Sequence, residues 1–282
     1  MPIIEIRDLS YSYPNIESLT LADINLTVEE GEFVVFTGPS GCGKTTLCRC
    51  LNGLIPHFYG GDLKGDVKVV GLSISDHSIS DMAQHVGFVF QSPENQLFAL
   101  SVEKDVAFGL ENLALPREEI RKSVEWAMDI VGISDLREKA PFELSGGQQQ
   151  RVAIASVLTM KPKLVVLDEP TSFLDPLASK NLFEIIKKLN RELGLTMILI
   201  EHRLDLLSTY ASRIIVMDKG RIKADGSPRS VLSSTEVESL GIGLPKIFKL
   251  HRMLKENGVD LGEPPLSVEE FVKSVRKALK HD

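Results

Sequence analysis

A glycine-rich stretch of the chain has the residue types and the spacing of a phosphate-binding loop. Residues Gly38–Thr45 fit the pattern G-x-x-x-x-G-K-[ST] between the apolar run Phe33–Phe36 and a helical pattern. Glycines let successive backbone N–H groups turn toward phosphate oxygens, and the N-terminus of the following helix adds positive potential. In such a loop Lys44 reaches the β- and γ-phosphates, and the Thr45 hydroxyl coordinates Mg²⁺. We therefore expect ATP and Mg²⁺ to bind here, with ATP contacting Gly38, Pro39, Ser40, Gly41, Cys42, Gly43, Lys44, Thr45 and Thr46.

Two acidic residues follow a second apolar run. Leu164–Leu167 reads as a buried strand, and it would deliver Asp168 beside the metal and Glu169 next to the γ-phosphate. We predict that Asp168 belongs to the metal site, usually through water, and that Glu169 is the general base that polarises the attacking water. Acidic residues at strand ends are often merely solvated. A phosphate-binding loop requires such a carboxylate, however, and this strand supplies it in the right order.

The stretch Leu144–Arg151, between these two motifs, reads Leu-Ser-Gly-Gly-Gln-Gln-Gln-Arg. A small hydroxyl and bare backbone amides near a helix start form a second phosphate cradle. The stretch resembles the signature sequence of ABC ATPases, and the other motifs follow that family's order over residues 1 to about 235. The resemblance implies that the signature contacts the γ-phosphate held by another subunit, so that ATP joins two subunits face to face. The residues concerned are Ser145, Gly146, Gly147 and Gln148.

The same resemblance assigns roles to four further segments. Tyr13 resembles the aromatic residue that stacks on adenine, although Tyr11, two positions away, is an alternative. Gln91 resembles the Q-loop glutamine, which touches Mg²⁺ and links the site to a transmembrane partner. Ser172–Asp175 resembles the D-loop, and His202 the switch histidine that contacts the γ-phosphate. A lone histidine is more often structural, but His202 directly follows a buried strand and would point toward the end of the sheet that carries the acids.

The segment Phe90–Phe98 is similar to the Q-loop region of ATPases from energy-coupling factor (ECF) transporters. These transporters import vitamins and transition-metal ions. In them two ATPases, identical or related chains, sit beneath a transmembrane coupling protein and a substrate-binding membrane protein. The C-terminal part of this chain also looks like the extension with which such ATPases associate. The resemblance therefore implies an ATPase that energises micronutrient import.

Two alternatives use the same ATP chemistry. The chain could serve an ABC importer outside the ECF group, in which case residues 240–282 would be a regulatory or stabilising tail. It could also be an ABC protein that acts on nucleic acid or the ribosome. Chromosome-maintenance relatives place a long coiled coil between the loop and the signature, but here only about a hundred residues separate Lys44 from Ser145 and no sustained heptads occur.

The elements that must position these residues alternate between strands and helices, which predicts a parallel sheet with helices on both faces. The resemblance implies an α/β P-loop NTPase (RecA-like) core with a mostly parallel sheet and an N-terminal antiparallel β subdomain. It also implies an inserted α-helical subdomain at about residues 95–155. We divide the chain into an ATPase domain, residues 1–235, and a small C-terminal helical extension, residues 236–282, which we expect to be a dimerisation element. Two helices are expected in the first half of the chain, one over Lys44–Leu54 and one that begins at Pro116 and ends at Gly132. The last strand is expected at Ile214–Met217. A terminal helix is expected to begin at Ser267, with Glu270 completing a capping box.

Composition limits the remaining classes of function. Of the 282 residues 43% are hydrophobic and 25% charged, which suits a globular protein with a substantial core. A net charge of −7 argues against a nucleic-acid binder, which needs a basic surface. No apolar run approaches the length that spans a bilayer, and the first residues lack a signal-peptide core. We therefore expect a peripheral protein on the cytoplasmic face of the cell membrane, held there by partners, with reduced cysteines used as small apolar residues.

Overall fold

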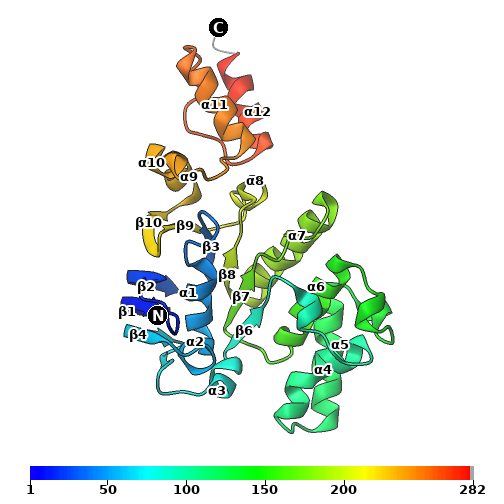
Figure 1. Cartoon of the computed structure of the whole chain (residues 1–282). Helices are drawn as coiled ribbons and strands as arrows, with labels where there is room; N and C mark the ends of the chain where they lie inside the picture. Colours follow the sequence, from blue (N-terminus) through cyan, green and yellow to red (C-terminus); the bar gives the residue numbers. More distant parts are fainter. Residues whose placement is uncertain (280–282) are drawn as a thin grey trace.

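A central six-stranded sheet carries the edge at which the chemistry-bearing residues gather. The computed structural model describes residues 1–279, and Figure 1 shows its arrangement. The strand order is β10-β9-β3-β8-β7-β6, and all neighbouring strands except β10 and β9 run parallel. The strands are β3 (Phe33–Thr37), β6 (Val86–Val89), β7 (Leu164–Asp168), β8 (Thr196–Ile200), β9 (Arg213–Asp218) and β10 (Arg221–Gly226). Because parallel strands end at the same edge, the residues after β3, β7 and β8 meet there.

The prediction that Ile214–Met217 is the last strand is wrong. Strand β10 follows it, pairs antiparallel with β9 and closes this side of the sheet. Its sequence, Arg-Ile-Lys-Ala-Asp-Gly, alternates between exposed and half-buried residues and contains no apolar run. An edge strand with one solvated face therefore escapes a search for buried strands.

A second, antiparallel sheet of four strands forms the N-terminal subdomain. Its order is β2-β1-β4-β5, with β1 (Pro2–Ser12), β2 (Leu21–Glu29), β4 (Asp62–Val69) and β5 (Leu72–Ser73). Ile4 on β1 lies opposite Val28 on β2 and Val69 on β4, and all three are buried. Alternate residues therefore give this sheet one apolar face, which packs toward the central sheet.

The central sheet is covered differently on its two faces. Val34 and Phe36 of β3 pack into a core shared with helix α1 (Lys44–Leu51) and the antiparallel sheet. Phe33 and Val35 pack into the opposite core, which contains the remaining larger helices. Helices therefore lie on both faces, as expected, and the antiparallel sheet shares one of these faces with α1.

Helix α1 ends three residues before the predicted boundary. Gly53 adopts a left-handed φ of 76°, which stops the helical pattern after Leu51. A separate short helix, α2 (Leu54–His57), continues the chain, and α3 (Ile79–Ala83) begins at Ser78 with a capping box completed by Asp81. The prediction placed the end of the helix too late because apolar residues after Asn52 continue the helical spacing across this break.

An inserted helical subdomain lies beside the sheet, at the lower right of Figure 1. It contains α4 (Val102–Asn112), α5 (Arg117–Val131) and α6 (Gly146–Leu158), with short 3₁₀ turns at Pro93–Asn95, Ser134–Leu136 and Pro141–Glu143. Pro116 and the left-handed Gly132 flank α5, as predicted, and Val124, Met128 and Val131 are buried. The bounds of about 95–155 for this subdomain stay a prediction.

The chain continues with α7 (Pro176–Leu193), α8 (Leu204–Leu207), α9 (Pro228–Leu232) and α10 (Thr235–Ser239), and ends in α11 (Lys246–Glu256) and α12 (Val268–Ala278). Helices α11 and α12 form a lobe at the top of Figure 1. Val237, Leu244 and Phe248 are nevertheless buried in the main core, so part of the extension packs on the ATPase domain. The division after residue 235 stays a prediction, and its last residues, 280–282, lie outside the described range.

The predicted capping box of α12 is half right. The Ser267 hydroxyl accepts the Glu270 N–H at 3.1 Å, but the Glu270 carboxylate accepts from the N–H of Leu266, not Ser267. Within residues 1–279, no helix is long and apolar enough to cross a membrane.

Candidate functional site

The glycine-rich loop connects the end of β3 to the start of α1, as the pattern predicts. A Cβ at Gly38 would lie 2.0 Å from the Met217 carbonyl oxygen, and one at Gly43 would lie 2.9 Å from that of Thr20. Both glycines also have positive φ, 142° and 108°. These two positions therefore require glycine because the loop passes close to neighbouring backbone.

Lys44 lies folded against this loop and is only 5% exposed. Its Nζ donates to the carbonyl oxygens of Gly38 at 2.9 Å and Pro39 at 3.0 Å. The thiol of Cys42 lies 3.7 Å from the same ammonium group, and burial still raises the pKa of Cys42. The loop thus places one positive charge, beside a neutral thiol, where a nucleotide's phosphates would need it.

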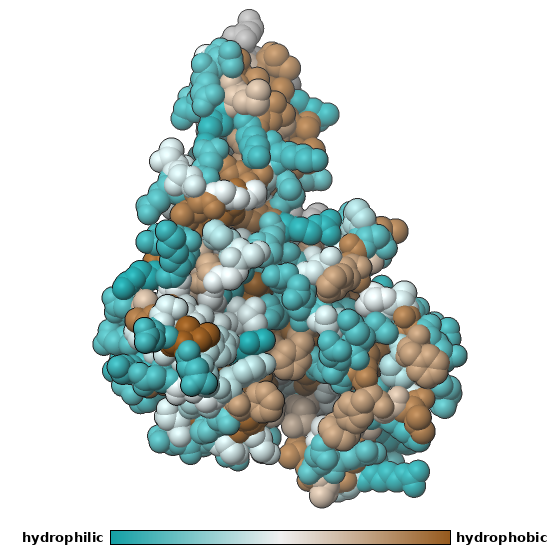
Figure 2. Space-filling view, viewed as in Figure 1, coloured by the Kyte–Doolittle hydropathy of each residue, from teal (hydrophilic) through white to brown (hydrophobic). Residues whose placement is uncertain are grey.

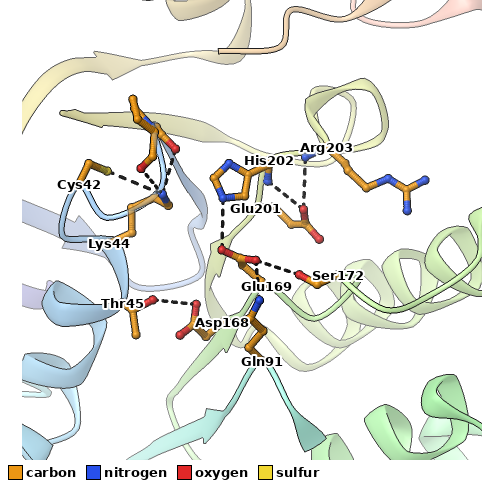
Figure 3. Close-up of polar contacts among 12 residues, drawn as sticks. Cys42, Lys44, Thr45, Gln91, Asp168, Glu169, Ser172, Glu201, His202 and Arg203 are labelled. Carbon is orange, nitrogen blue, oxygen red and sulfur yellow. Dashed lines mark hydrogen bonds and ion pairs between the residues drawn. The ribbon is translucent and has the colours of Figure 1, made fainter. Parts of the chain in front are cut away.

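Asp168 ends β7 directly beside the first turn of α1. The Thr45 hydroxyl donates to Asp168 Oδ1 at 3.2 Å (Figure 3). Burial is the main cause that raises the pKa of Asp168, and the neighbouring Glu169 adds to it. A hydroxyl and a carboxylate are the hard oxygen ligands that Mg²⁺ prefers.

The donor set fits Mg²⁺ held jointly with phosphates. Within the described residues, no group of three or more His, Cys, Asp or Glu side chains could hold a metal ion on its own. Mg²⁺ is ordinarily bound by one or two carboxylates together with substrate phosphates, whereas zinc and calcium sites use more protein ligands. Thr45, Asp168 and the side-chain oxygen of Gln91 match the magnesium pattern.

Glu169 stands at the centre of a cluster drawn from three segments of the chain (Figure 3). Gln91 Nε2 donates to its Oε2 at 2.9 Å, and the Ser172 hydroxyl donates to the same oxygen at 2.9 Å. His202 Nε2 lies 3.2 Å from its Oε1. Glu169 itself has a left-handed φ of 46°, and its N–H donates to Ile200 at 3.0 Å. The structure therefore brings together the predicted base, the Q-loop glutamine, the D-loop and the switch histidine.

The two candidate tyrosines have different environments. Tyr11 is fully buried and donates its hydroxyl hydrogen to the Gly60 carbonyl oxygen at 2.9 Å, so its ring is part of the core. Tyr13, just beyond β1, is half-exposed, and its hydroxyl contacts Thr46 Oγ1 at 3.1 Å. Arg49 also donates to that hydroxyl, at 3.2 Å. Tyr13 is thus next to the loop helix, which supports it over Tyr11 as the aromatic contact for adenine.

The signature residues begin helix α6. Ser145 is its N-cap and forms a capping box with Gln148, whose Oε1 accepts the Ser145 N–H at 2.9 Å. The nearest atoms to a Cβ added at Gly147 belong to Ala178 and Leu174, at 3.6 and 3.7 Å. In the described chain the hydrogen bonds of Ser145 and Gln148 stay within this turn and none reaches the phosphate-binding loop. The two predicted phosphate cradles are therefore not joined by hydrogen bonds within the described part of one protomer.

Sequence reasoning missed three residues that support this cluster. They are Thr171, Glu201 and Arg203, whose contacts link the D-loop to the switch histidine. The sequence contained one signal for Glu201, because this charged residue stands between the buried strand β8 and His202. The roles of all the predicted site residues stay predictions.

Comparisons with known proteins all point to the same protein family. A family profile described as ABC transporter matches residues 21–172. A protein of Pyrococcus abyssi named as an ABC transporter ATP-binding protein is 45% identical over 281 residues, 99% of this chain and 100% of that protein. A protein of the same name from Pyrococcus horikoshii is 47% identical over 92% of each chain. One from Methanosarcina mazei is 44% identical over 90% of this chain but only 44% of that longer protein.

Two solved structures are also similar. CbiO1 from Clostridium perfringens, described as part of the ABC transporter complex CbiONQ, aligns with a TM-score of 0.76 and 35% identity over 91% of this chain and 97% of that chain. A dimeric post-hydrolysis state of the ATP-binding cassette MJ0796, bound to ADP and phosphate, aligns with a TM-score of 0.70 and 29% identity over 80% of this chain and 99% of that chain.

Proposed function

Because this chain belongs to the ATP-binding proteins of ABC transporters, we propose that it hydrolyses ATP as one half of a two-ATPase sandwich and energises micronutrient import through an ECF-type transporter. The predicted P-loop fold and the ATPase class are confirmed. The residue roles, the partners and the direction of transport are our proposals. The imported micronutrient would be a vitamin or a transition-metal ion recognised by another subunit.

The proposed chemistry is attack of water on the γ-phosphorus of ATP. Glu169 accepts the proton of the water, the new P–O bond forms, and the bond to the β-phosphate oxygen breaks to release ADP and phosphate. Lys44 and His202 steady the γ-phosphate. Thr45, Asp168 and Gln91 would hold Mg²⁺, which supplies positive charge for the phosphate oxygens. Tyr13 stacks on adenine.

The observation that carries this proposal is the position of Glu169. Its two oxygens contact Gln91, Ser172 and His202 at 2.9–3.2 Å, and its side chain keeps 23% exposure. A general base needs a fixed orientation and access to water. Glu169 has both, next to the residues proposed for the metal and the phosphates.

Replacing Glu169 tests the assigned base directly. In Glu169→Gln the amide keeps the shape but cannot accept a proton, so we expect turnover to fall by about 10²-fold or more while ATP still binds. Phosphate release and binding of a fluorescent ATP analogue would be measured on the full chain. ATP should also trap this variant as a dimer in size-exclusion chromatography with light scattering. Normal turnover would remove Glu169 from its role.

The two-subunit arrangement follows from the separate cradles. Within one protomer Ser145–Gln148 form no hydrogen bond with the loop that holds Lys44, in the part of the chain described. A second phosphate cradle is useful only if another nucleotide reaches it, and a neighbouring subunit supplies that nucleotide. A similar solved cassette is itself described as a dimer with ADP and phosphate.

A hydrophobic groove is our candidate docking site for the transmembrane coupling protein. It lies between strand β6, at the edge of the central sheet, and the helical subdomain, and Figure 2 shows hydrophobic atoms around this hollow. Phe98 and Phe108 on its rim are 65% and 43% exposed, with ring centroids 4.7 Å apart. Gln96, also on the groove, accepts the Phe90 N–H, one residue before Gln91. The groove is thus close in sequence and structure to the glutamine that contacts Glu169.

Weakening this groove should uncouple the ATPase from the membrane. In Phe98→Ser we expect at least about tenfold less of the coupling protein to co-purify from detergent extracts, because a large interface aromatic is lost. ATP binding by the isolated chain should be unchanged. Leu193→Ser is the matched control, because Leu193 is the last residue of α7 and is 40% exposed. The coupling protein should co-purify with this variant as with the wild type. Recovery of RNA or DNA in place of a membrane protein would contradict the transport proposal.

A further inference from the structure

Glu201 is a buried acidic residue for which the mechanism above has no role. It follows β8, immediately before His202, and is only 3% exposed. Its N–H donates to the Phe36 carbonyl oxygen at 3.1 Å, which anchors it to the end of β3. A carboxylate so buried destabilises a fold unless several donors compensate it. The donors it finds therefore indicate what it is for.

In the described chain, the Glu201 carboxylate accepts hydrogen bonds from two segments, and both segments also carry a residue that contacts Glu169. Oε2 accepts the backbone N–H groups of His202 at 2.9 Å and Arg203 at 3.2 Å. Oε1 accepts the hydroxyl of Thr171, which is itself 1% exposed. Figure 3 shows Glu201 beneath the backbone of His202 and Arg203. One buried carboxylate thus joins the end of β8 to the segment that follows β7.

The residues next to these contacts are the ones that hold Glu169. Thr171 precedes Ser172, which donates to Glu169 Oε2, and Glu201 precedes His202, whose ring contacts Glu169 Oε1. Arg203 adds a further link, because its Nη1 donates to the fully buried Ser179 hydroxyl on α7 at 2.8 Å. The two carboxylates therefore bridge the same two segments, one in the interior and one at the reacting edge.

We infer that Glu201 is a positioning residue for ATP hydrolysis: it locks the Thr171–Ser172 segment to the His202 segment, so that both partners of Glu169 keep their place. The inference depends on the proposed role of Glu169. Without the lock, Ser172 and His202 would move independently, and Glu169 would lose its fixed orientation. Misplacement of a catalytic group by about 1 Å can lower a rate by about 10²-fold, even when substrate still binds.

The test compares Glu201→Ala, Glu201→Gln and Thr171→Val in the full chain. Glu201→Ala and Thr171→Val should each lower kcat by about tenfold, with the Kd of a fluorescent ATP analogue within about twofold of wild type. Because both break one link, the double variant should lose about tenfold in total, not about a hundredfold. In Glu201→Gln the side-chain oxygen can still accept both N–H groups and the amide can donate to Thr171. That variant should recover to within about threefold of wild type.

Glu32→Ala is the matched control. Glu32 pairs with Arg213 at 3.2 Å, is partly buried and precedes β3, at the opposite edge of the sheet from Glu201. Its loss should lower the Tm without changing kcat. A kcat within twofold of wild type in Thr171→Val, which keeps the side-chain shape, would overturn the inference even if Glu201→Ala does not fold. Additive losses in the double variant would also overturn it.

The outcome with Glu169→Gln separates the two levels of the argument. Normal hydrolysis in that variant would defeat the proposed base, and the inference with it. Loss of hydrolysis there, together with unchanged kcat in Thr171→Val, would defeat only the positioning role of Glu201.

Discussion

Asp168 and Glu169 are neighbours in the chain, but the fold gives them different environments. Asp168 is 5% exposed, and burial raises its pKa, whereas the Glu169 side chain retains 23% exposure and contacts three polar side chains. The first suits a ligand whose charge is balanced by a cation, and the second suits a group that must meet water. The proposed division of roles matches the positions of the two residues, because Asp168 ends the strand and Glu169 turns out of it.

The raised pKa of Asp168 predicts a stability effect with a definite sign. A carboxyl whose pKa is higher in the folded than in the unfolded state contributes stability below the unfolded pKa and loses it as pH rises through the folded pKa. At neutral pH the ionised Asp168 therefore destabilises the nucleotide-free protein. Asp168→Asn should raise the Tm at pH 7 by a few degrees, and this gain should shrink toward pH 4.

Differential scanning fluorimetry in EDTA at both pH values checks this prediction, and the same variant should have lost Mg²⁺-dependent hydrolysis. Asp62→Asn, whose side chain is 67% exposed, is the control and should leave the Tm unchanged at either pH. A lower Tm for Asp168→Asn at pH 7 would contradict the assigned cause.

At the scale of the element, glycines serve two different purposes. Gly38 and Gly43 are needed by their own protomer, because a Cβ at either position would collide with backbone. Gly146 and Gly147, at the start of α6, have room for a Cβ at ordinary contact distances, and neither has positive φ. Nothing within the described chain requires glycine at the signature, so the requirement is expected to come from a neighbour's nucleotide.

Gly147→Ala separates folding from function at this helix. Alanine is up to about 1 kcal/mol more favourable than glycine in a helix, so the Tm should be unchanged or slightly higher. Hydrolysis should fall at least about tenfold, because the added methyl displaces the partner's γ-phosphate. Phosphate release and thermal unfolding check this. Gly226→Ala, where a Cβ would also have room, should change neither, and full activity of Gly147→Ala would contradict the sandwich.

At the scale of the whole molecule, the C-terminal lobe presents an apolar surface on α12. Val268, Val272 and Leu279 are 60%, 40% and 71% exposed, and Figure 2 shows hydrophobic atoms on the α12 side of the lobe. Exposed apolar residues that line one helix face are typical of an interaction site. This agrees with the proposal that the extension associates with a second ATPase, in addition to the contact that ATP itself makes.

Changing this face should weaken association in the absence of nucleotide. Val272→Gln replaces a 40%-exposed apolar residue, and we expect the dimer dissociation constant to rise about tenfold. Lys255→Gln, at an exposed position on α11, is the control and should not change it. Analytical ultracentrifugation of the full chain measures both, and an unchanged dimer in Val272→Gln would exclude this face from the interface.

Local sequence patterns were enough for the loop at Gly38–Thr45, the acids after β7, the flanks of α5 and the overall α/β class. Each of these depends on residues close together in the chain, such as a buried strand followed by glycines, or Pro116 and Gly132 around an amphipathic helix. Their physical causes, backbone freedom and side-chain periodicity, act over a few residues. Strand β10 and the early end of α1 were missed because a half-solvated strand and a single glycine leave weak local patterns.

Contacts between distant segments had to await the folded chain. Gln91, Ser172 and His202 meet at Glu169 because β6, β7 and β8 are adjacent and parallel, so that the residues after them share one edge. The burial of Tyr11 and the links from Glu201 to Thr171 depend equally on which strand lies beside which. Strand order is set by packing of the whole core, and no short stretch of sequence encodes it.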